Sequence, residues 1–469
     1  MHESVSLTRA PVKIGVAGNP CTYQQVERVI KAESAARTSL RAMGGHCWCV
    51  FFFLFFFSAA FSDGRRGITD PPAGPFTGRR LAATSAPLST NIIGAYTMAL
   101  DFGTPPQTLT FVMDTGSNFV WFPCTANYVC DNCSSLLPSP STRIPTFIST
   151  ESSSSKEVTC SSPKCSWLHH NASVCEEGGD RCSPYFILYG TGDTSGLPLL
   201  ETLRLKDLIV PEFLVGCSTI TTAHPTGIAG LGRGPASLPS QLNLTKFSYC
   251  SFSFKSLSNK STQNTILLDY SHKSGKKTEG IAYTPFVRNP IVDGKSAYLA
   301  YYYVSLRRIS LGNKRVKIPY KYLAPNNEGN GGTVMDSGST FTFLPRGVFD
   351  PLSDELMAQM DVKGYRRNFE AEIENNLSPC YDFPMDNASF PHLRLQFKGS
   401  MTLRLSMENF MAPVGSGNST SCFAVVTDDG GDLEGPGIVL GNFQFQNYYI
   451  EYDLDNERLG FRRQQCKLT

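Results

Sequence analysis

Two short acidic segments of the chain are nearly identical. Residues 111–117 read FVMDTGS and residues 333–339 read TVMDSGS, so that Asp336 follows Asp114 after 222 residues. A single Asp-[Thr/Ser]-Gly-[Ser/Thr] tetrapeptide occurs by chance in roughly one chain of forty at this length. Two copies with the same apolar lead-in are not expected by chance, so the pair is the first candidate for chemistry.

The residues around each acid suit a carboxylate pair. An apolar run predicts a buried strand before the acid, and Gly116 and Gly338 permit tight turns that bring backbone N–H groups close to it. Neighbouring hydroxyls can donate to the carboxylates or join the two loops: Thr115, Ser117, Ser337 and Ser339. Two acids that meet would share a proton at acidic pH. One would then act as general base on a water and the other as general acid on a carbonyl oxygen.

A second internal match supports an evolutionary duplication over the alternative of two unrelated aspartate turns. Ile228-Ala229-Gly230 follows the first acid and Val439-Leu440-Gly441 follows the second at a similar distance. The period is too long for a solenoid. We therefore expect two similar β lobes with one acid each.

Length and composition favour a mainly β protein of two domains. The chain of 469 residues exceeds one typical core, and it is rich in Gly, Pro and short β-type runs. We place the N-terminal lobe at residues 94–283 and the C-terminal lobe at 284–469. A net charge of +2 gives no support for binding to nucleic acid or another polyanion.

The N-terminal region has the pattern of a targeting segment. Residues 47–61 form an apolar core within 1–62, short for a membrane-spanning helix and followed by small residues. Either translation starts at Met43, which makes this a cleaved signal peptide, or the segment is an uncleaved signal anchor. We favour the first. Residues 63–93 are expected to be a short prosegment or a disordered leader, with order beginning near residue 94.

Cysteine usage indicates an oxidising compartment. Of fifteen cysteines, twelve follow residue 123, an even number compatible with six disulfides. Seven of these lie in 124–182, which is too polar to form its own core and is interpreted as a disulfide-bonded insertion. Cys130 and Cys133 form a single C-x-x-C without a second pair, so neither zinc nor another metal or cofactor is expected.

Further strands, a hairpin and a helix are predicted on either side of the two acids. Strands are expected at 95–100 and 108–113, and a hairpin at 185–205 with Tyr189-Gly190 near its turn. Residues 298–306 suggest an aromatic strand and 349–360 a helix. Residues 255–280 are interpreted as a loop between the lobes.

With these motifs the chain resembles the pepsin-like aspartic proteases, and within them the cysteine-rich nepenthesin-type branch, over residues 94–466. The resemblance implies a mainly β, bilobal fold with the active site in the cleft between pseudo-symmetric lobes. It implies an acid endopeptidase without a cofactor that binds protein or peptide substrates in extended conformation, does not bind nucleic acid and acts as a monomer. The expected compartment is the secretory pathway, ending in the cell wall, outside the cell or in the vacuole.

The same resemblance implies roles for individual residues. Asp114 and Asp336 would be the catalytic pair, and Thr115 and Ser337 would tie the active loops together. Ser117 and Ser339 would bond the outer carboxylate oxygens, beside Gly116 and Gly338. Tyr189 and Gly190 would belong to the flap, a hairpin that folds over substrate, with the Trp121 indole N–H steadying Tyr189; the alternatives are a packed hairpin tyrosine and a core tryptophan.

The nepenthesin-type resemblance implies a set of disulfides, and sequence motifs predict sites of N-glycosylation. By cysteine order the bridges would be Cys124–Cys130, Cys133–Cys217, Cys160–Cys182, Cys165–Cys175, Cys250–Cys466 and Cys380–Cys422. N-glycosylation sequons begin at Asn171, Asn243, Asn259, Asn376, Asn387 and Asn418.

One alternative function belongs to a different class. Some relatives of this fold bind or inhibit glycosidases and are proteolytically silent, but they typically lose an active aspartate or its glycine neighbour. Both tetrapeptides are intact here.

Overall fold

The computed structural model describes residues 83–90, 95–137, 139, 142–168, 179–253, 264–271, 275–292, 295–383, 390–415, 419–427 and 435–466. All of them lie within one compact unit, Phe76–Thr469. The apolar segment 47–61 and most of the predicted prosegment fall outside the described residues. No helix in the described ranges is both long enough and apolar enough to cross a membrane.

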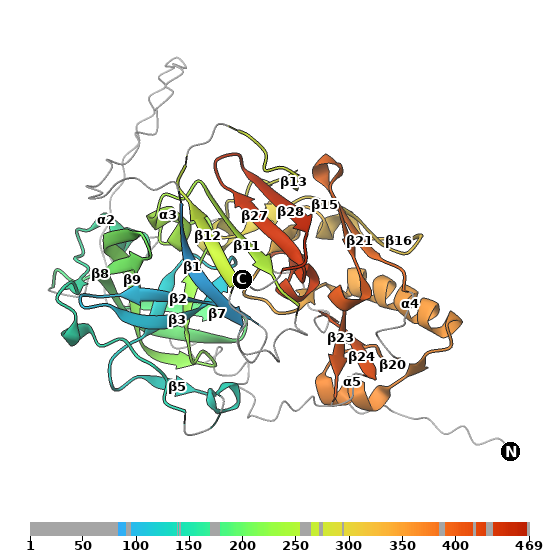
Figure 1. Ribbon diagram of the computed structural model, residues 1–469, viewed down its shortest axis with the longest axis horizontal. Helices are drawn as coiled ribbons and strands as arrows, with labels where there is room; N and C mark the ends of the chain where they lie inside the picture. The colour runs from blue at the N-terminus through green and yellow to red at the C-terminus, as the bar shows by residue number, and fades with distance from the viewer. Residues whose placement is uncertain are drawn as a thin grey trace, which may run out of the picture. The chain divides into compact units, whose positions relative to one another are not determined.

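The largest sheet collects strands from the first half of the chain and from its end (Figure 1). Its strands are β1 (Ala83–Thr90), β2 (Tyr96–Phe102), β3 (Gln107–Asp114), β4 (Val120–Pro123), β5 (Val129–Asp131), β6 (Lys156–Glu157), β7 (Tyr185–Tyr189), β8 (Gly192–Leu205), β9 (Leu208–Thr222), β10 (Gly227–Gly230), β11 (Lys246–Ser251), β12 (Asn264–Asp269), β13 (Ala282–Pro285), β27 (Tyr448–Asp453) and β28 (Arg458–Arg463). The order is β13-β28-β27-β11-β12-β1-β2-β3-β10-β4-β9-β8-β6, with β5 on β9 and β7 on β8. The two ends of the described chain therefore share one sheet.

Three smaller sheets belong to the second half. One has the order β14-β17-β26-β18-β25, another β16-β15-β21-β22 and the third β19-β20-β24-β23. Their bounds are β14 (Tyr302–Val304), β15 (Leu306–Leu311), β16 (Lys314–Val316), β17 (Thr333–Met335), β18 (Thr342–Phe343), β19 (Arg366–Arg367), β20 (Cys380–Asp382), β21 (Leu393–Phe397), β22 (Thr402–Leu405), β23 (Met411–Val414), β24 (Thr420–Phe423), β25 (Val425–Val426) and β26 (Ile438–Leu440).

Helices are few and short in the described residues. The α-helices are α2 (Pro163–Ser166), α3 (Leu238–Gln241), α4 (Arg346–Val362) and α5 (Phe369–Asn375), and the 3-10 turns are η1 (Ser134–Leu136), η2 (Ser149–Glu151), η4 (Ser296–Leu299), η5 (Tyr320–Tyr322), η7 (Lys398–Ser400), η8 (Met407–Asn409) and η9 (Asn442–Phe445). Helix α4 contains the predicted helix 349–360 and buries Val348, Leu352, Leu356 and Met360 on one face. Their spacing is that of a helix packed against a core.

The apolar core continues from one half of the chain into the other. Alternate residues of β3 point inward, with Leu109, Phe111 and Met113 buried. They join a cluster that also holds Met335 and Tyr452 from the second half. Burial of this continuous cluster fixes the strands that end at the two acids.

Two expectations about elements were wrong, and a third was right only in part. Ordered structure begins before residue 94, because β1 pairs with both β12 and β2. The interval 255–280, interpreted as a loop, contains β12, where Ile266 and Leu268 are buried by alternation in a polar stretch. The aromatic run 298–306 is divided between η4, β14 and the start of β15.

Candidate active site

Both acids stand where a strand ends beside a parallel neighbour. Strand β10 pairs with β3 so that Gly230 lies opposite Asp114, and the Leu231 N–H donates to the Asp114 carbonyl at 2.7 Å. In the second half β26 pairs with β17 in the same way, and the Asp336 N–H donates to the Leu440 carbonyl at 3.0 Å. The internal match read from the sequence is thus a repeated three-dimensional arrangement.

A reciprocal set of hydrogen bonds joins the two loops. The Thr115 N–H donates to Ser337 Oγ at 3.0 Å, and the Ser337 N–H donates to Thr115 Oγ1 at 2.9 Å. Each hydroxyl then donates to a carbonyl across the pair: Thr115 Oγ1 to Met335 at 3.2 Å and Ser337 Oγ to Met113 at 2.7 Å. Thr115 and Ser337 are both buried. Four satisfied bonds in a buried place hold the loops at one separation.

The glycines allow the carboxylates to approach. The Gly116 N–H donates to Asp114 Oδ1 at 2.8 Å and the Gly338 N–H to Asp336 Oδ1 at 2.9 Å. A Cβ on Gly338 would lie 2.5 Å from Asp114 Oδ1, and one on Gly116 would lie 2.8 Å from Asp336 Oδ1. Each glycine therefore makes room for the carboxylate of the other half.

The two acids differ in their surroundings. Asp114 is buried, and burial together with the negative charge of Asp336 raises the pKa of Asp114 to about 8, although the Gly116 N–H acts against this. Asp336 is less buried and accepts a hydrogen bond from Ser339 Oγ at 2.6 Å. Asp114 therefore keeps its proton to a higher pH than an isolated carboxyl group does.

Ser117 does not repeat the bond that Ser339 makes. Its hydroxyl lies near Asp114 and Tyr189 and lowers the pKa of each, yet Ser117 Oγ is buried without meeting the geometry of a hydrogen bond. Within the described residues, the expected contact from Ser117 to Asp114 is therefore less well aligned than the bond from Ser339 to Asp336.

A hairpin of β7 and β8 brings Tyr189 to the same place. The Trp121 Nε1–H donates to the Tyr189 hydroxyl at 2.8 Å, and Trp121 is fully buried. Burial and the charge of Asp114 raise the pKa of Tyr189 well above its usual value, so the phenol stays protonated. Phe186 and Leu188 are 66% and 71% exposed, which leaves apolar side chains of this hairpin in contact with solvent.

His224 completes the packing behind Tyr189 and was missed by the sequence reasoning. Its ring lies 5.1 Å from the Tyr189 ring and 6.2 Å from the Trp121 ring, edge-on to both. Burial lowers the pKa of His224, with the charge of Asp193 opposing, and Nε2 has no hydrogen-bond partner among the described residues. A lone histidine in a loop gives no sequence signal for this position.

Tyr301 was also missed. Burial and the charges of Asp336 and Asp114 raise the pKa of Tyr301 to about 12. The aromatic run 298–306 marked the segment, and Tyr301 lies in the turn between η4 and β14.

The comparisons with known proteins agree with this geometry. Family models for the xylanase inhibitor N-terminal and C-terminal domains match residues 96–268 and 301–463. Aspartic proteinase nepenthesin-1 of Nepenthes gracilis is 31% identical over 80% of this chain and 78% of its own length. A probable aspartyl protease of Arabidopsis thaliana is 31% identical over 79% and 82%. This chain belongs to the pepsin-like aspartic protease family, in its nepenthesin-type branch.

Solved structures support the fold of this family member. The crystal structure of edgp matches with a TM-score of 0.63 and 20% identity, over 84% of this chain and 96% of the other. Basic 7S globulin from soybean matches with a TM-score of 0.61 and 17% identity, over 82% and 98%. The mainly β, pepsin-like fold expected from the sequence is confirmed.

The cysteine-rich insertion of this aspartic protease relative is bonded differently from expectation. Cys124 bonds Cys217, because β4 and β9 run parallel and place Phe122 opposite Cys217. Cys130 of β5 bonds its near neighbour Cys133, which follows the strand. The predicted pairs Cys124–Cys130 and Cys133–Cys217 were therefore wrong.

The second half of the insertion also differs. Cys165 of α2 bonds Cys182, whereas the prediction paired these with Cys175 and Cys160. Both bonded cysteines pack in the cluster that holds Trp121, which brings them together. Cys160 is disulfide-bonded too, and Cys175 lies outside the described residues.

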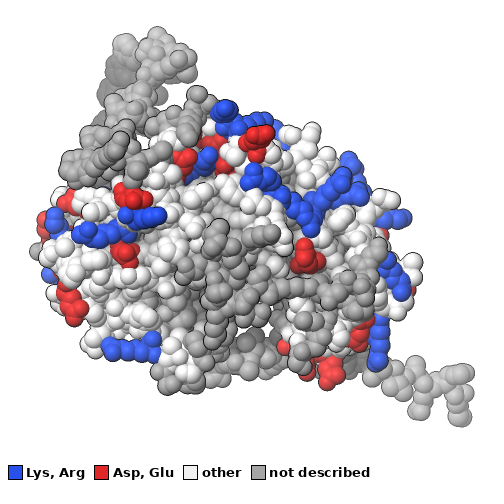
Figure 2. Space-filling model, in the orientation of Figure 1, with Lys and Arg blue, Asp and Glu red and all other residues white. Residues whose placement is uncertain are grey.

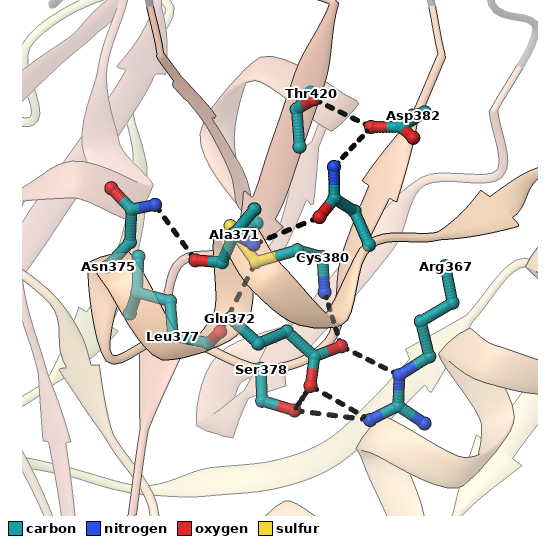
Figure 3. The surroundings of a disulfide bond; sticks show 11 residues. Arg367, Ala371, Glu372, Asn375, Leu377, Ser378, Cys380, Asp382 and Thr420 are labelled. Atoms are coloured by element: carbon teal, nitrogen blue, oxygen red, sulfur yellow. Dashed lines mark hydrogen bonds and ion pairs between the residues drawn. A yellow bond between two sulfur atoms is a disulfide. The ribbon is translucent and has the colours of Figure 1, made fainter.

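Two predicted bridges are present: Cys250–Cys466 and Cys380–Cys422. Figure 3 shows how the second is held at α5. The Glu372 carboxylate accepts from the Cys380 N–H at 3.1 Å and pairs with Arg367 at 2.7 Å, and the Asn368 side chain accepts the Ala371 N–H at 2.9 Å as the helix N-cap.

Other predicted sites are only partly described. Asn243 and Asn376 are exposed, as a glycosylated side chain must be, and glycosylation there remains a prediction. Asn171, Asn259, Asn387 and Asn418 lie outside the described residues. Across the described part of the chain no cluster of three or more His, Cys, Asp or Glu side chains could hold a metal ion.

Proposed function

We propose that this chain is an aspartic endopeptidase that hydrolyses peptide bonds in proteins at acid pH, with Asp114 and Asp336 as its catalytic pair. One observation carries the proposal. The two carboxyl groups face each other across glycines that leave room for them, on loops joined by the reciprocal Thr115 and Ser337 bonds.

The chemistry follows from a shared proton. A water between the carboxyl groups gives a proton to the ionised aspartate as its oxygen attacks the scissile carbonyl carbon. The protonated aspartate donates to the carbonyl oxygen, which yields a tetrahedral diol without a covalent enzyme intermediate. Proton transfer to the leaving nitrogen and collapse of the diol then break the C–N bond.

The hairpin of β7 and β8 suits an extended substrate. Tyr189 is steadied by Trp121 beside Asp114, so backbone groups at the hairpin turn, including Gly190, can pair with a substrate strand laid over the acids. A Cβ on Gly190 would touch nothing within 4 Å, which leaves the turn open for that pairing.

A second candidate function is inhibition of a glycosidase, because both matching family models are described as xylanase inhibitor domains. On that alternative the chain would bind a glycosidase and leave peptides uncut. The intact tetrapeptides around Asp114 and Asp336 favour the protease.

The deciding experiment is cleavage of denatured globin from pH 2 to 7 by secreted, purified protein, with and without pepstatin, beside Asp336→Asn. Acid-dependent cleavage that both changes abolish supports the protease. Inactive but correctly disulfide-bonded protein that binds a xylanase supports the alternative.

The biological setting is part of the proposal. We infer passage through the secretory pathway with a cleaved signal at 47–61, processing of a prosegment, and a monomer as the active form. The disulfides in the described residues support an oxidising compartment.

A further inference from the structure

The four-stranded sheet β16-β15-β21-β22 has one apolar face and one strongly basic face. Its inward side chains are buried: Ile309, Leu311, Val316, Leu393, Leu395, Phe397, Leu403 and Leu405. The outward side chains follow from the strand pairing. Ser310 lies opposite both Arg315 and Arg394, Arg394 lies opposite Arg404, and Arg308 lies opposite Gln396, which faces Thr402. We call these seven outward residues the arginine face.

The arginine face contains no acid. The four strands carry six basic residues, Arg307, Arg308, Lys314, Arg315, Arg394 and Arg404, and no Asp or Glu. Figure 2 shows blue side chains gathered over the region that Figure 1 labels β28, β15 and β21. A net charge of only +2 for the whole chain conceals this local excess.

Several arginines elsewhere in the described residues have carboxylate partners. Arg233 pairs with Glu457, Arg367 with Glu372 and Arg458 with Asp453. No ion pair is found for Arg308, Arg315, Arg394 or Arg404 within the described ranges, and Arg394 Nε is buried without an acceptor.

This arrangement is unfavourable unless an anion occupies it. Arg394 and Arg404 are directly opposite on antiparallel strands, where like charges destabilise a sheet. Neighbouring strands are about 4.8 Å apart, so the row from Arg315 to Arg404 spans roughly 14 Å. A guanidinium presents a planar fork that binds a carboxylate through two hydrogen bonds.

We propose that the arginine face binds a linear, carboxylated polysaccharide. The arginines would hold successive carboxylates, while Ser310, Gln396 and Thr402 would hydrogen-bond sugar hydroxyls between them. Lipid surfaces are bound with apolar side chains inserted beside the charges, and single-stranded nucleic acid with stacked aromatics. The seven outward residues include neither. The proposal concerns a surface away from Asp114 and Asp336 and does not depend on proteolysis.

The test measures binding of the purified full chain to polygalacturonate, with fully methyl-esterified polymer as the uncharged control. Wild type should bind the acidic polymer, bind the ester poorly and release with salt. Arg308→Gln/Arg404→Gln should weaken binding about tenfold or more. The matched control Arg143→Gln/Arg366→Gln, which removes two exposed arginines elsewhere, should stay within about twofold.

A stability measurement and a comparison with other anionic ligands complete the test. Removal of Arg404 relieves repulsion with Arg394, so the melting temperature of Arg308→Gln/Arg404→Gln should be unchanged or higher than that of wild type. If this double variant unfolds, Arg308→Lys/Arg404→Lys replaces it. The lysine variant keeps the charge but loses the planar fork, and it should still bind polygalacturonate more weakly than wild type. Equal loss in the control pair, or wild-type binding by the double variant, would overturn the proposal. Tighter binding to phosphatidylserine vesicles or duplex DNA than to polygalacturonate would overturn it as well.

Discussion

The two active loops share a sequence motif and a backbone arrangement, but their side chains differ in burial and in hydrogen bonding. In the first loop Asp114 is buried beside Trp121 and Tyr189, and Ser117 Oγ meets no hydrogen-bond geometry within the described part of the chain. In the second loop Asp336 is more exposed and is bonded by Ser339. The comparison teaches that a duplicated motif can place the same residue type in two unlike environments, one buried and one more exposed.

The largest expected effect is loss of the pair itself. Asp336→Asn or Asp114→Asn should lower kcat/KM for a peptide at acid pH at least about a thousandfold, since neither amide can exchange the proton. Asp354→Asn on the exposed face of α4 is the matched control and should be neutral. Comparable loss in the control, or an active pair variant, would refute the assigned roles.

The second-largest effect is expected from a substitution that crowds one acid from the opposite loop. Gly338→Ala places a Cβ 2.5 Å from Asp114 Oδ1, and the resulting displacement should lower kcat about a hundredfold. Gly364→Ala adds the same methyl in the exposed turn after α4, where nothing lies within 4 Å, so its kcat should remain close to wild type. Equal kcat values for the two variants would contradict the close approach.

The two serines test the asymmetry most directly. Ser339→Ala removes a hydrogen bond to a carboxylate and should lower kcat roughly tenfold to a hundredfold. Ser117→Ala removes only the less well aligned contact and should change kcat less than about threefold. Kinetics that show the same loss for both would mean that the loops are equivalent in solution.

His224 is expected to act through Tyr189 as a positioning residue. His224→Ala should leave a space behind the Tyr189 and Trp121 rings and lower kcat/KM about tenfold, whereas His224→Phe should restore most of it by filling that space. A loss in kcat/KM that phenylalanine does not restore would assign the effect to imidazole chemistry instead of packing.

The smallest effect concerns stability. Because the folded pKa of Asp114 is raised to about 8, its proton stabilises the fold fully below the unfolded pKa near 4, and this contribution is lost as pH rises through 8. Asp114→Asn should therefore gain several degrees in melting temperature relative to wild type between pH 4 and pH 8. A difference that stays constant over this range would contradict the raised pKa.

The sequence predicted what local patterns determine. Each acid follows an apolar strand, and β3 and α4 were recognised from alternation and helical spacing. The glycine turn after Tyr189 predicted a hairpin, and the family resemblance singled out Tyr189 within it. His224 and the register of the arginine face were not found, because both depend on contacts between segments far apart in the chain. The disulfide partners of Cys124 and Cys165 depend on which strands run side by side, which the order of cysteines does not determine.

The bridge from Cys250 to Cys466 links β11 to the residue that follows β28. A single backbone nick anywhere between these cysteines, for example at the exposed Lys276-Lys277, would leave both fragments covalently joined. Strands β27 and β28 would also stay hydrogen-bonded in the large sheet. Nicked and intact protein would then run as one band without reductant and separate into two fragments only after reduction, so a two-chain form can be mature protein rather than debris.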